Sequence, residues 1–321
     1  MRRWAAGLVG AGMLVLVIGA ATMTRRPQPS PAPAPDTAPR GVLVTPSGVV
    51  APILATDEAG WWVRTPCFRV GRADAGTVVE SVDVVLDPGH GGGEDGAVSP
   101  DGLREADVNA AVAEQVARRL EAQGLTVLVT HPNAYTLLLH PRGEIATALA
   151  PRVMVSIHHN SVYERVIDEP GTIALHQKDS AVSRRLAELL DAEVGAAIAP
   201  LGDRWAAGDD LGPQSKASVD DPRWDWFGLL RFSSSVPSVI VEAAYVGNGP
   251  DGDPPSSPEG PLLATDAFRD AEADGIARAI EAFLAEPPAT TGEPPAHPSG
   301  APAQDPLAAS CVDPADVSLP V

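Results

Sequence analysis

The chain has 321 residues and carries 42 acidic side chains against 23 Lys and Arg, so its formal charge at pH 7 is −19. This balance argues against a general nucleic-acid binder, because neutralising phosphates requires clustered basic residues. Hydrophobic residues make up 44% of the chain, which is enough to build a globular core. Two cysteines, Cys67 and Cys311, are too few for a disulfide-dense scaffold or a four-cysteine zinc site.

Residues 1–26 predict export as a signal peptide or a membrane anchor. Residues 4–22 contain no charged side chain and follow Arg2 and Arg3, a pattern that is typical of both. Small residues suited to cleavage lie near position 20, so cleavage and anchoring both stay open. The proline-rich residues 27–40 predict a stiff tether. We therefore expect a protein of the cell envelope or the extracellular space, with membrane contact only through this N-terminal segment.

Two flanking segments differ in composition from the main body. Residues 41–81 contain short apolar runs separated by Gly and Pro, and predict a small β-rich segment. Residues 286–321 repeat the Pro and Ala composition of the tether, and predict a disordered tail. Cys311 lies in that tail, where it either pairs with Cys67 in an oxidising compartment or remains an independent thiol.

Residues 82–285 alternate between apolar runs and helical periodicity. The runs that predict strands are residues 82–86, 125–129, 153–157, 171–176 and 236–244. The stretches that predict helices are residues 104–123, 142–150, 181–198 and 266–284. This alternation predicts an α/β fold with a mainly parallel twisted sheet flanked by helices on both faces. Ligands of such sheets bind at the carboxyl ends of the strands.

Three side chains that can bind a metal occur at that predicted edge. His90 follows the first strand, His158 follows the third, and Glu105 begins the first helix. Two imidazoles and a carboxylate are the ligand set of an open catalytic zinc site, which keeps a fourth position for water. Glu242 lies in the apolar last strand and is left to act as the acid/base, with a pKa that its apolar neighbours should raise.

Each of these residues also has a simpler interpretation. A histidine after a strand commonly only hydrogen-bonds within a turn, and Glu105 commonly only interacts with the helix dipole. The glycines around His90 are also compatible with a phosphate-binding loop. However, the loop lacks both the Gly-Lys-Ser/Thr and the G-x-G-x-x-G pattern.

The chain resembles the zinc-dependent N-acetylmuramoyl-L-alanine amidases over residues 82–284. The motifs that carry the resemblance are residues 84–92, Glu105 with Val108 and Asn109, residues 156–160, and residues 241–248. That family cleaves the amide between the lactyl group of N-acetylmuramic acid and L-alanine in peptidoglycan. The resemblance implies that His90, Glu105 and His158 bind Zn²⁺ and that Glu242 is catalytic, in agreement with the interpretation of the residues alone.

Some positions depart from the family pattern. His131 follows Thr130 where an arginine is usual, His159 stands where a small residue is usual, and Ala244 replaces a glycine. Strand alternation directs His158 and His159 to opposite faces, so only one of them can bind the metal. The motif favours His158.

Two residues are candidates for substrate binding. Asn160 follows the histidine pair, and Arg231 matches an arginine often found before the last strand of the family. The alternative role of Arg231 is to pair with a carboxylate. The acidic residues 205–227 contain three tryptophans and predict a lid, a groove wall or an autoinhibitory element.

The leading hypothesis is an exported, zinc-dependent hydrolase that acts on peptidoglycan or muropeptides, with an activator protein as a second partner. The first alternative is a zinc carboxypeptidase on stem peptides, with Arg142 or Arg231 binding the terminal carboxylate. The second alternative is a catalytically silent wall-binding or regulatory module, which would neither bind zinc nor turn over substrate.

Overall fold

The computed structural model describes residues 31–34, 37–162, 171–202, 212–248, 259–287 and 305–319. The predicted signal or anchor segment and part of the tether lie outside these residues. Within the described part of the chain, no helix is long and apolar enough to cross a membrane.

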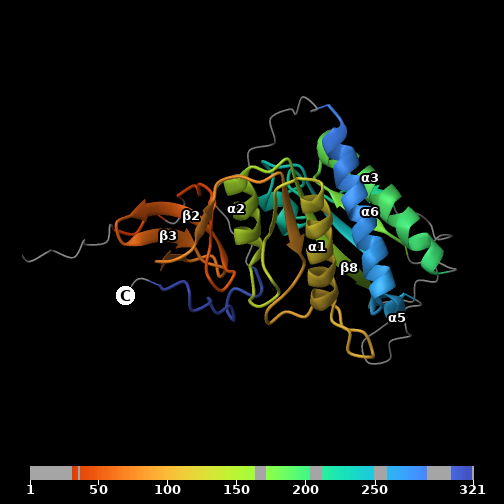
Figure 1. Cartoon of the computed structure of the whole chain (residues 1–321), viewed down its shortest axis with the longest axis horizontal. Coiled ribbons are helices and arrows are strands. Elements are labelled where there is room, and N and C mark those ends of the chain that lie inside the picture. Colours follow the sequence, from red (N-terminus) through yellow and green to blue (C-terminus); the bar gives the residue numbers. More distant parts are fainter. Residues whose placement is uncertain are drawn as a thin grey trace, which may run out of the picture.

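Residues 41–81 form an antiparallel sheet with the strand order β4-β3-β2-β1-β5. Its strands are β1 (Val42–Val44), β2 (Val50–Asp57), β3 (Gly60–Arg64), β4 (Val70–Ala73) and β5 (Thr77–Val79). Figure 1 shows this sheet beside helix α2, on the side of the molecule away from α1 and α6. The segment therefore packs onto the main body as an outer layer.

The main sheet has the order β10-β9-β11-β8-β6-β7. Its strands are β6 (Val84–Pro88), β7 (Val127–Val129), β8 (Val153–Val162), β9 (Ile173–His176), β10 (Gly212–Gln214) and β11 (Ser238–Asn248). Neighbouring strands are parallel except β9 and β11, which are antiparallel. The chain thus has the mixed α/β fold that the alternation of strands and helices predicts.

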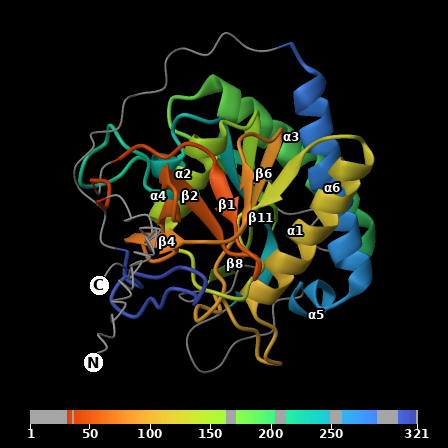
Figure 2. The same ribbon diagram turned by 60° about the vertical axis from the view of Figure 1, so that its left-hand side comes forward.

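Helices pack against this sheet through two hydrophobic cores. The helices are α1 (Glu105–Ala122), α2 (Leu139–Leu149), α3 (Ala181–Ile198), α4 (Gly228–Phe232), α5 (Gly260–Leu263) and α6 (Asp266–Ala285), with a 3₁₀ turn at Ala199–Leu201. One core contains buried residues of α1, α3 and α6, and the other contains residues of α2, α4 and the N-terminal sheet (Figure 2). In β6, Val84 and Leu86 point into the first core and Val85 into the second, because strand side chains alternate between faces.

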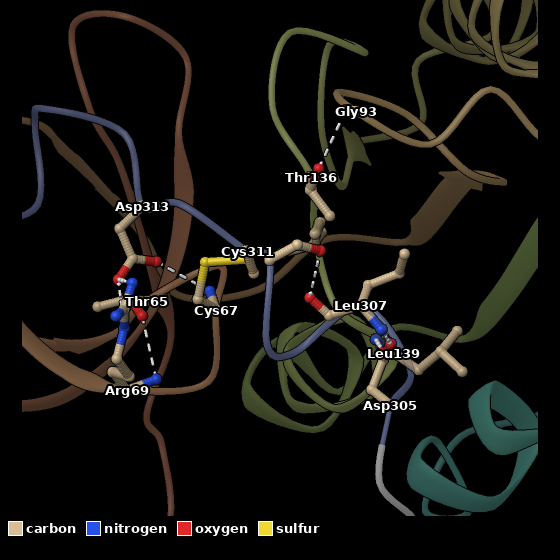
Figure 3. Close-up of a disulfide and its surroundings, with 12 residues drawn as sticks. Thr65, Cys67, Arg69, Gly93, Thr136, Leu139, Asp305, Leu307, Cys311 and Asp313 are labelled. Carbon is tan, nitrogen blue, oxygen red and sulfur yellow. Dashed lines mark hydrogen bonds and ion pairs between the residues drawn. A yellow bond between two sulfur atoms is a disulfide. The ribbon is translucent and has the colours of Figure 1, made fainter.

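The C-terminal residues 305–319 lie against the N-terminal sheet. Cys311 forms a disulfide with Cys67 (Figure 3), and Asp313 accepts hydrogen bonds from the Cys67 amide and from Arg69 Nε, both at 2.9 Å. Val317 is 4% exposed in the second core. The predicted disorder of residues 286–321 is therefore wrong for this part of the tail. A covalent bond and a buried apolar contact outweigh its Pro-rich and Ala-rich composition.

The same C-terminal segment also holds the start of helix α2. The N-cap residue is Leu138, whose side chain accepts no hydrogen bond from the helix. Instead, Asp305 Oδ2 accepts a hydrogen bond from the Leu139 amide at 3.0 Å. A carboxylate at this position satisfies a free N–H group and interacts favourably with the helix dipole. Segments from both ends of the chain therefore fix the position of α2.

Removing the disulfide should destabilise the protein. The disulfide joins residues 244 positions apart, so the double variant Cys67→Ser/Cys311→Ser has a less constrained unfolded chain. We therefore expect its free energy of unfolding to fall by about 2–4 kcal/mol. Urea denaturation of the variant and of wild type, each with and without reductant, measures this. Reductant should lower the wild-type midpoint to that of the variant and leave the variant unchanged; equal midpoints for oxidised wild type and variant would contradict the prediction.

Candidate active site

His90, which follows β6, Glu105, which begins α1, and His158, which lies within β8, come together in space; β8 continues to Val162, beyond the strand end predicted before His158. One ligand atom from each residue lies within 4.8 Å of the others. Glu105 Oε2 is 3.0 Å from His90 Nε2, and Glu105 Oε1 is 3.1 Å from His158 Nδ1. The carboxylate therefore lies between two imidazoles, one at each oxygen. The three predicted metal ligands form one cluster.

Two glycines allow these side chains to approach one another. A Cβ at Gly89 would lie 2.1 Å from His158 Cε1, and a Cβ at Gly96 would lie 2.6 Å from Glu105 Oε2. Gly96 also has a φ of 68°, a left-handed conformation that favours glycine. His90 itself adopts a φ of 63°, so its backbone must be held in place by neighbouring groups.

A buried ion pair beneath His90 supplies that support. Asp87 is fully buried and pairs with Arg142 Nη1 at 3.0 Å. Arg142 Nη2 donates a hydrogen bond of 2.6 Å to the carbonyl oxygen of His90. Burial disfavours the ionised Asp87, but Arg142 and the hydroxyls of Thr130 and Ser156 hold its pKa below the usual range. Arg142 therefore fixes the loop that presents His90.

Glu242 lies on β11, the strand next to the one that carries His158. Its Cα is paired with that of His158 in the register between β11 and β8. Its Oε2 is buried without a hydrogen-bond partner among the described residues. Burial raises the pKa of Glu242, although the charge of His158 opposes the shift. A carboxyl group with a raised pKa is suited to act as a general acid/base.

The protonation of the cluster depends on the central carboxylate. Burial disfavours ionised Glu105, but its hydrogen bonds with His158 and His90 outweigh burial and hold its pKa well below the usual range. Burial also opposes charge on His90, yet Glu105 and Glu94 raise the pKa of His90 to about 10. Without a metal, His90 therefore carries a proton that cation binding would release.

A family model described as N-acetylmuramoyl-L-alanine amidase matches residues 84–282, which include His90, Glu105, His158 and Glu242. The chain belongs to this family. It is therefore a member of an enzyme family, as the sequence motifs imply.

The chain is also similar to curated relatives and to solved structures, some of which are named as amidases. YqiI of Bacillus subtilis is 29% identical over 213 residues, which make up 66% of this chain and 89% of that protein. The N-acetylmuramoyl-L-alanine amidase AmiC of Neisseria meningitidis is 28% identical over 229 residues, and the match covers 63% of this chain and about half, 52%, of that protein. The structure of N-acetylmuramoyl-L-alanine amidase AmiC2 of Nostoc punctiforme matches with a TM-score of 0.51 and 30% identity, covering 63% of this chain and 96% of that one.

A cleft of about 490 Å³ opens beside the cluster and Glu242. Asn160 lines this cleft, whereas Arg231 does not. Arg231 lies in α4, with its guanidinium 5.9 Å from the ring centre of Trp224. Among the described residues of 205–227, none lines the cleft, and Trp205 lies outside the described residues. The structure thus brings together the three predicted metal ligands, Glu242 and Asn160, and leaves Arg231 apart.

Three residues at the site were not predicted from the sequence. Glu94 Oε1 is 3.0 Å from His90 Nδ1, and Asn109 Nδ2 is 3.3 Å from Glu105 Oε1. Glu272, in α6, is fully buried and contacts His159. A sequence signal exists for Glu272, because it is an acidic residue on the otherwise apolar face of a helix. Its partner was not predictable, because α6 and β8 are distant in the chain.

His131 occupies a position under the His90 loop and is kept neutral by its neighbours. Its Nε2 donates to the carbonyl of Pro88 at 2.8 Å, and its Nδ1 accepts from the Asn133 amide at 3.2 Å. Both nitrogens are thus engaged in the neutral tautomer. Burial, together with the nearby charge of Arg142, lowers the pKa of His131 to about 3.

His131 should make the protein less stable in acid. Its folded pKa lies below its unfolded value, so the unfolded chain binds the proton first and stability falls as pH drops from about 6.5 towards 3. In His131→Gln, we expect the slope of unfolding free energy against pH between 4 and 6 to decrease by about 1.4 kcal/mol per unit. Urea denaturation at several pH values tests this. Above pH 7 the plots of unfolding free energy against pH for wild type and His131→Gln should run parallel. If they also run parallel down to pH 4, the prediction is wrong.

Proposed function

We propose that the chain is a zinc-dependent hydrolase that cleaves the amide between N-acetylmuramic acid and L-alanine in peptidoglycan. The observation that carries the proposal is the His90–Glu105–His158 cluster, with Glu242 paired opposite His158 beside an open cleft. Family membership supports the substrate class. The alternation of β8 supports His158 rather than His159 as the ligand, because the His159 side chain is fully buried on the other face.

The donor set fits zinc. Two imidazole nitrogens and one carboxylate oxygen within 4.8 Å of one another match a three-ligand catalytic site that leaves a position open towards the cleft. His90, Glu105 and His158 would hold the ion. When bound, zinc lowers the pKa of water towards about 7 and polarises a substrate carbonyl.

Glu242 supplies the proton transfers in this proposal. Its buried carboxylate accepts a proton as water adds to the lactyl carbonyl carbon. It then donates that proton to the alanine nitrogen as the C–N bond breaks, releasing the stem peptide and a lactyl carboxylic acid. Asn160 is placed on the cleft to hydrogen-bond the peptide. We assign Arg231 to packing in α4 rather than to substrate binding.

The composition of the cleft favours the amidase over a carboxypeptidase. Its described lining contains Glu94, Asp95, Glu105 and Glu242 but no Lys or Arg. Arg142, which sequence alone leaves available for a terminal carboxylate, is 4% exposed and committed to Asp87. A substrate carboxylate would therefore find no cation among the described lining residues to offset this negative charge.

The disulfide supports a location outside the cytoplasm. Structural disulfides persist mainly in oxidising compartments, and Cys67 pairs with Cys311. Together with the apolar segment at residues 4–22, this pairing supports export to the cell envelope.

Replacing Glu242 by Gln should abolish turnover without removing the metal site. We expect kcat on purified muropeptides to fall by a factor of about 10²–10⁴, because the acid/base is lost. Mass spectrometry should detect free stem peptides with an L-alanine amino end for wild type only. Glu114→Gln, which alters an exposed carboxylate of α1, is the matched control and should retain activity. Release of a terminal D-amino acid by wild type would instead indicate a carboxypeptidase.

Replacing His158 by Ala should remove the metal. The variant loses one of three protein ligands, so we expect no stoichiometric zinc after dialysis, whereas wild type retains it. Metal analysis by mass spectrometry measures the zinc content, and circular dichroism checks that the fold is kept. Equal zinc content in variant and wild type would exclude His158 as a ligand.

A further inference from the structure

A buried polar network links helix α6 to the proposed metal ligand Glu105. His159 Nε2 is 3.0 Å from Glu272 Oε2, and His159 Nδ1 is 2.7 Å from Asn109 Oδ1. These three residues are at most 1% exposed. Burying so many polar groups together is costly unless their hydrogen bonds are made. The network therefore calls for a role beyond filling the core.

The hydrogen-bond pattern fixes the orientation of the Asn109 amide. Asn109 Nδ2 donates to the carbonyl of Gly89 at 3.1 Å and to Glu105 Oε1 at 3.3 Å. The amide oxygen must then face His159, whose Nδ1 donates to it. Turning the amide over would place its oxygen against the Glu105 carboxylate and its NH₂ group against an N–H donor. His159 thus reinforces the orientation in which Asn109 holds Glu105.

His159 also contacts Glu105 through its own backbone. Its amide N–H donates to Glu105 Oε1 at 3.2 Å. The same oxygen therefore receives hydrogen bonds from a side chain and a backbone group whose positions both depend on His159. The His159 and Glu272 side chains are fully buried, so they act on the cleft only through these neighbours.

Glu272 anchors the far end of the network at a cost in stability. Its Oε2 contacts His159, while its Oε1 is buried without a hydrogen-bond partner among the described residues. A half-satisfied carboxylate in a core is less favourable than an apolar side chain of similar size. Its presence indicates that orientation of His159, rather than stability, is what the carboxylate provides.

We propose that His159 and Glu272 are positioning residues that orient Asn109 and Glu105 and thereby set the affinity for zinc. The inference rests on the proposed zinc site and extends it to two side chains that are fully buried and are not themselves proposed ligands. Groups that orient a ligand commonly change metal affinity by factors of about 10–100.

The decisive variant is His159→Leu/Glu272→Leu in the full-length protein. It replaces both polar groups by apolar side chains, removes the buried Glu272 carboxylate and releases Asn109. We expect the dissociation constant for zinc, measured by competition with a chromophoric chelator, to rise about 10–100-fold. Urea denaturation of the metal-free protein should show stability equal to or above that of wild type. This combination separates positioning from a structural role, which would lower stability and leave zinc affinity unchanged.

Two further variants complete the test. Glu272→Gln keeps a hydrogen-bonding group for His159 Nε2, and should bind zinc nearly as tightly as wild type. Glu272→Met removes only the anchor, and should weaken zinc binding in the same direction as the double variant, which keeps the test available if the double variant does not fold. Glu114→Leu, on the exposed side of α1, is the matched surface control and should leave zinc affinity unchanged.

Wild-type zinc affinity in both Glu272→Met and the double variant would overturn the positioning role. The proposed function would stand in that case, provided that His158→Ala still loses zinc. Failure of wild type itself to bind zinc would overturn both proposals. Cobalt substitution adds an independent readout, because a displaced Glu105 should alter the visible absorption of the bound cobalt in the double variant.

Discussion

The site depends on one buried carboxylate, that of Glu105, which is 4% exposed at the start of α1. Its Oε2 accepts a hydrogen bond of 2.9 Å from the Ala97 amide, and its Oε1 accepts one of 3.2 Å from the His159 amide. The imidazoles of His90 and His158 lie at 3.0 and 3.1 Å from its two oxygens. An ionised carboxylate is costly to bury alone, so the loop after β6, strand β8 and helix α1 must converge on it. That convergence also brings together the three residues that we propose as metal ligands.

Two buried side chains, Arg142 and Glu272, help to position the proposed ligands. Arg142, paired with Asp87, donates to the His90 carbonyl, and Glu272 acts on Glu105 through His159. Well-packed apolar residues in place of both members of either buried pair, Arg142–Asp87 or Glu272–His159, would serve stability as well or better. Metal ligands must be held to within about 0.5 Å, and hydrogen bonds to fixed elements provide that accuracy. The buried polar groups therefore lower the stability of the fold somewhat, and in return they fix the positions of the proposed ligands.

The outer layer contributes to the same geometry from further away. The Cys67–Cys311 disulfide attaches the C-terminal segment to the N-terminal sheet, and Asp305 of that segment caps α2. Helix α2 carries Arg142, which holds the His90 loop. The N-terminal sheet and the C-terminal segment thus both affect the position of the His90 loop through α2. No described residue of either lines the cleft. This arrangement explains why residues 305–319 pack against the fold despite their composition.

The sequence by itself determined the α/β class, because the strand and helix periodicities are local. It also located four residues at one edge of the sheet, because parallel strands share their carboxyl ends: His90, Glu105, His158 and Glu242. Alternation along β8 also predicted that the His158 and His159 side chains point to opposite faces, and they contact Glu105 and Glu272 respectively. Only the tertiary structure decided the partners. Glu272 meets His159 across 113 positions and Cys67 meets Cys311 across 244. Arg142, open to substrate binding on sequence grounds, is buried against Asp87. Such pairings depend on how distant elements pack, and no local pattern of residues encodes them.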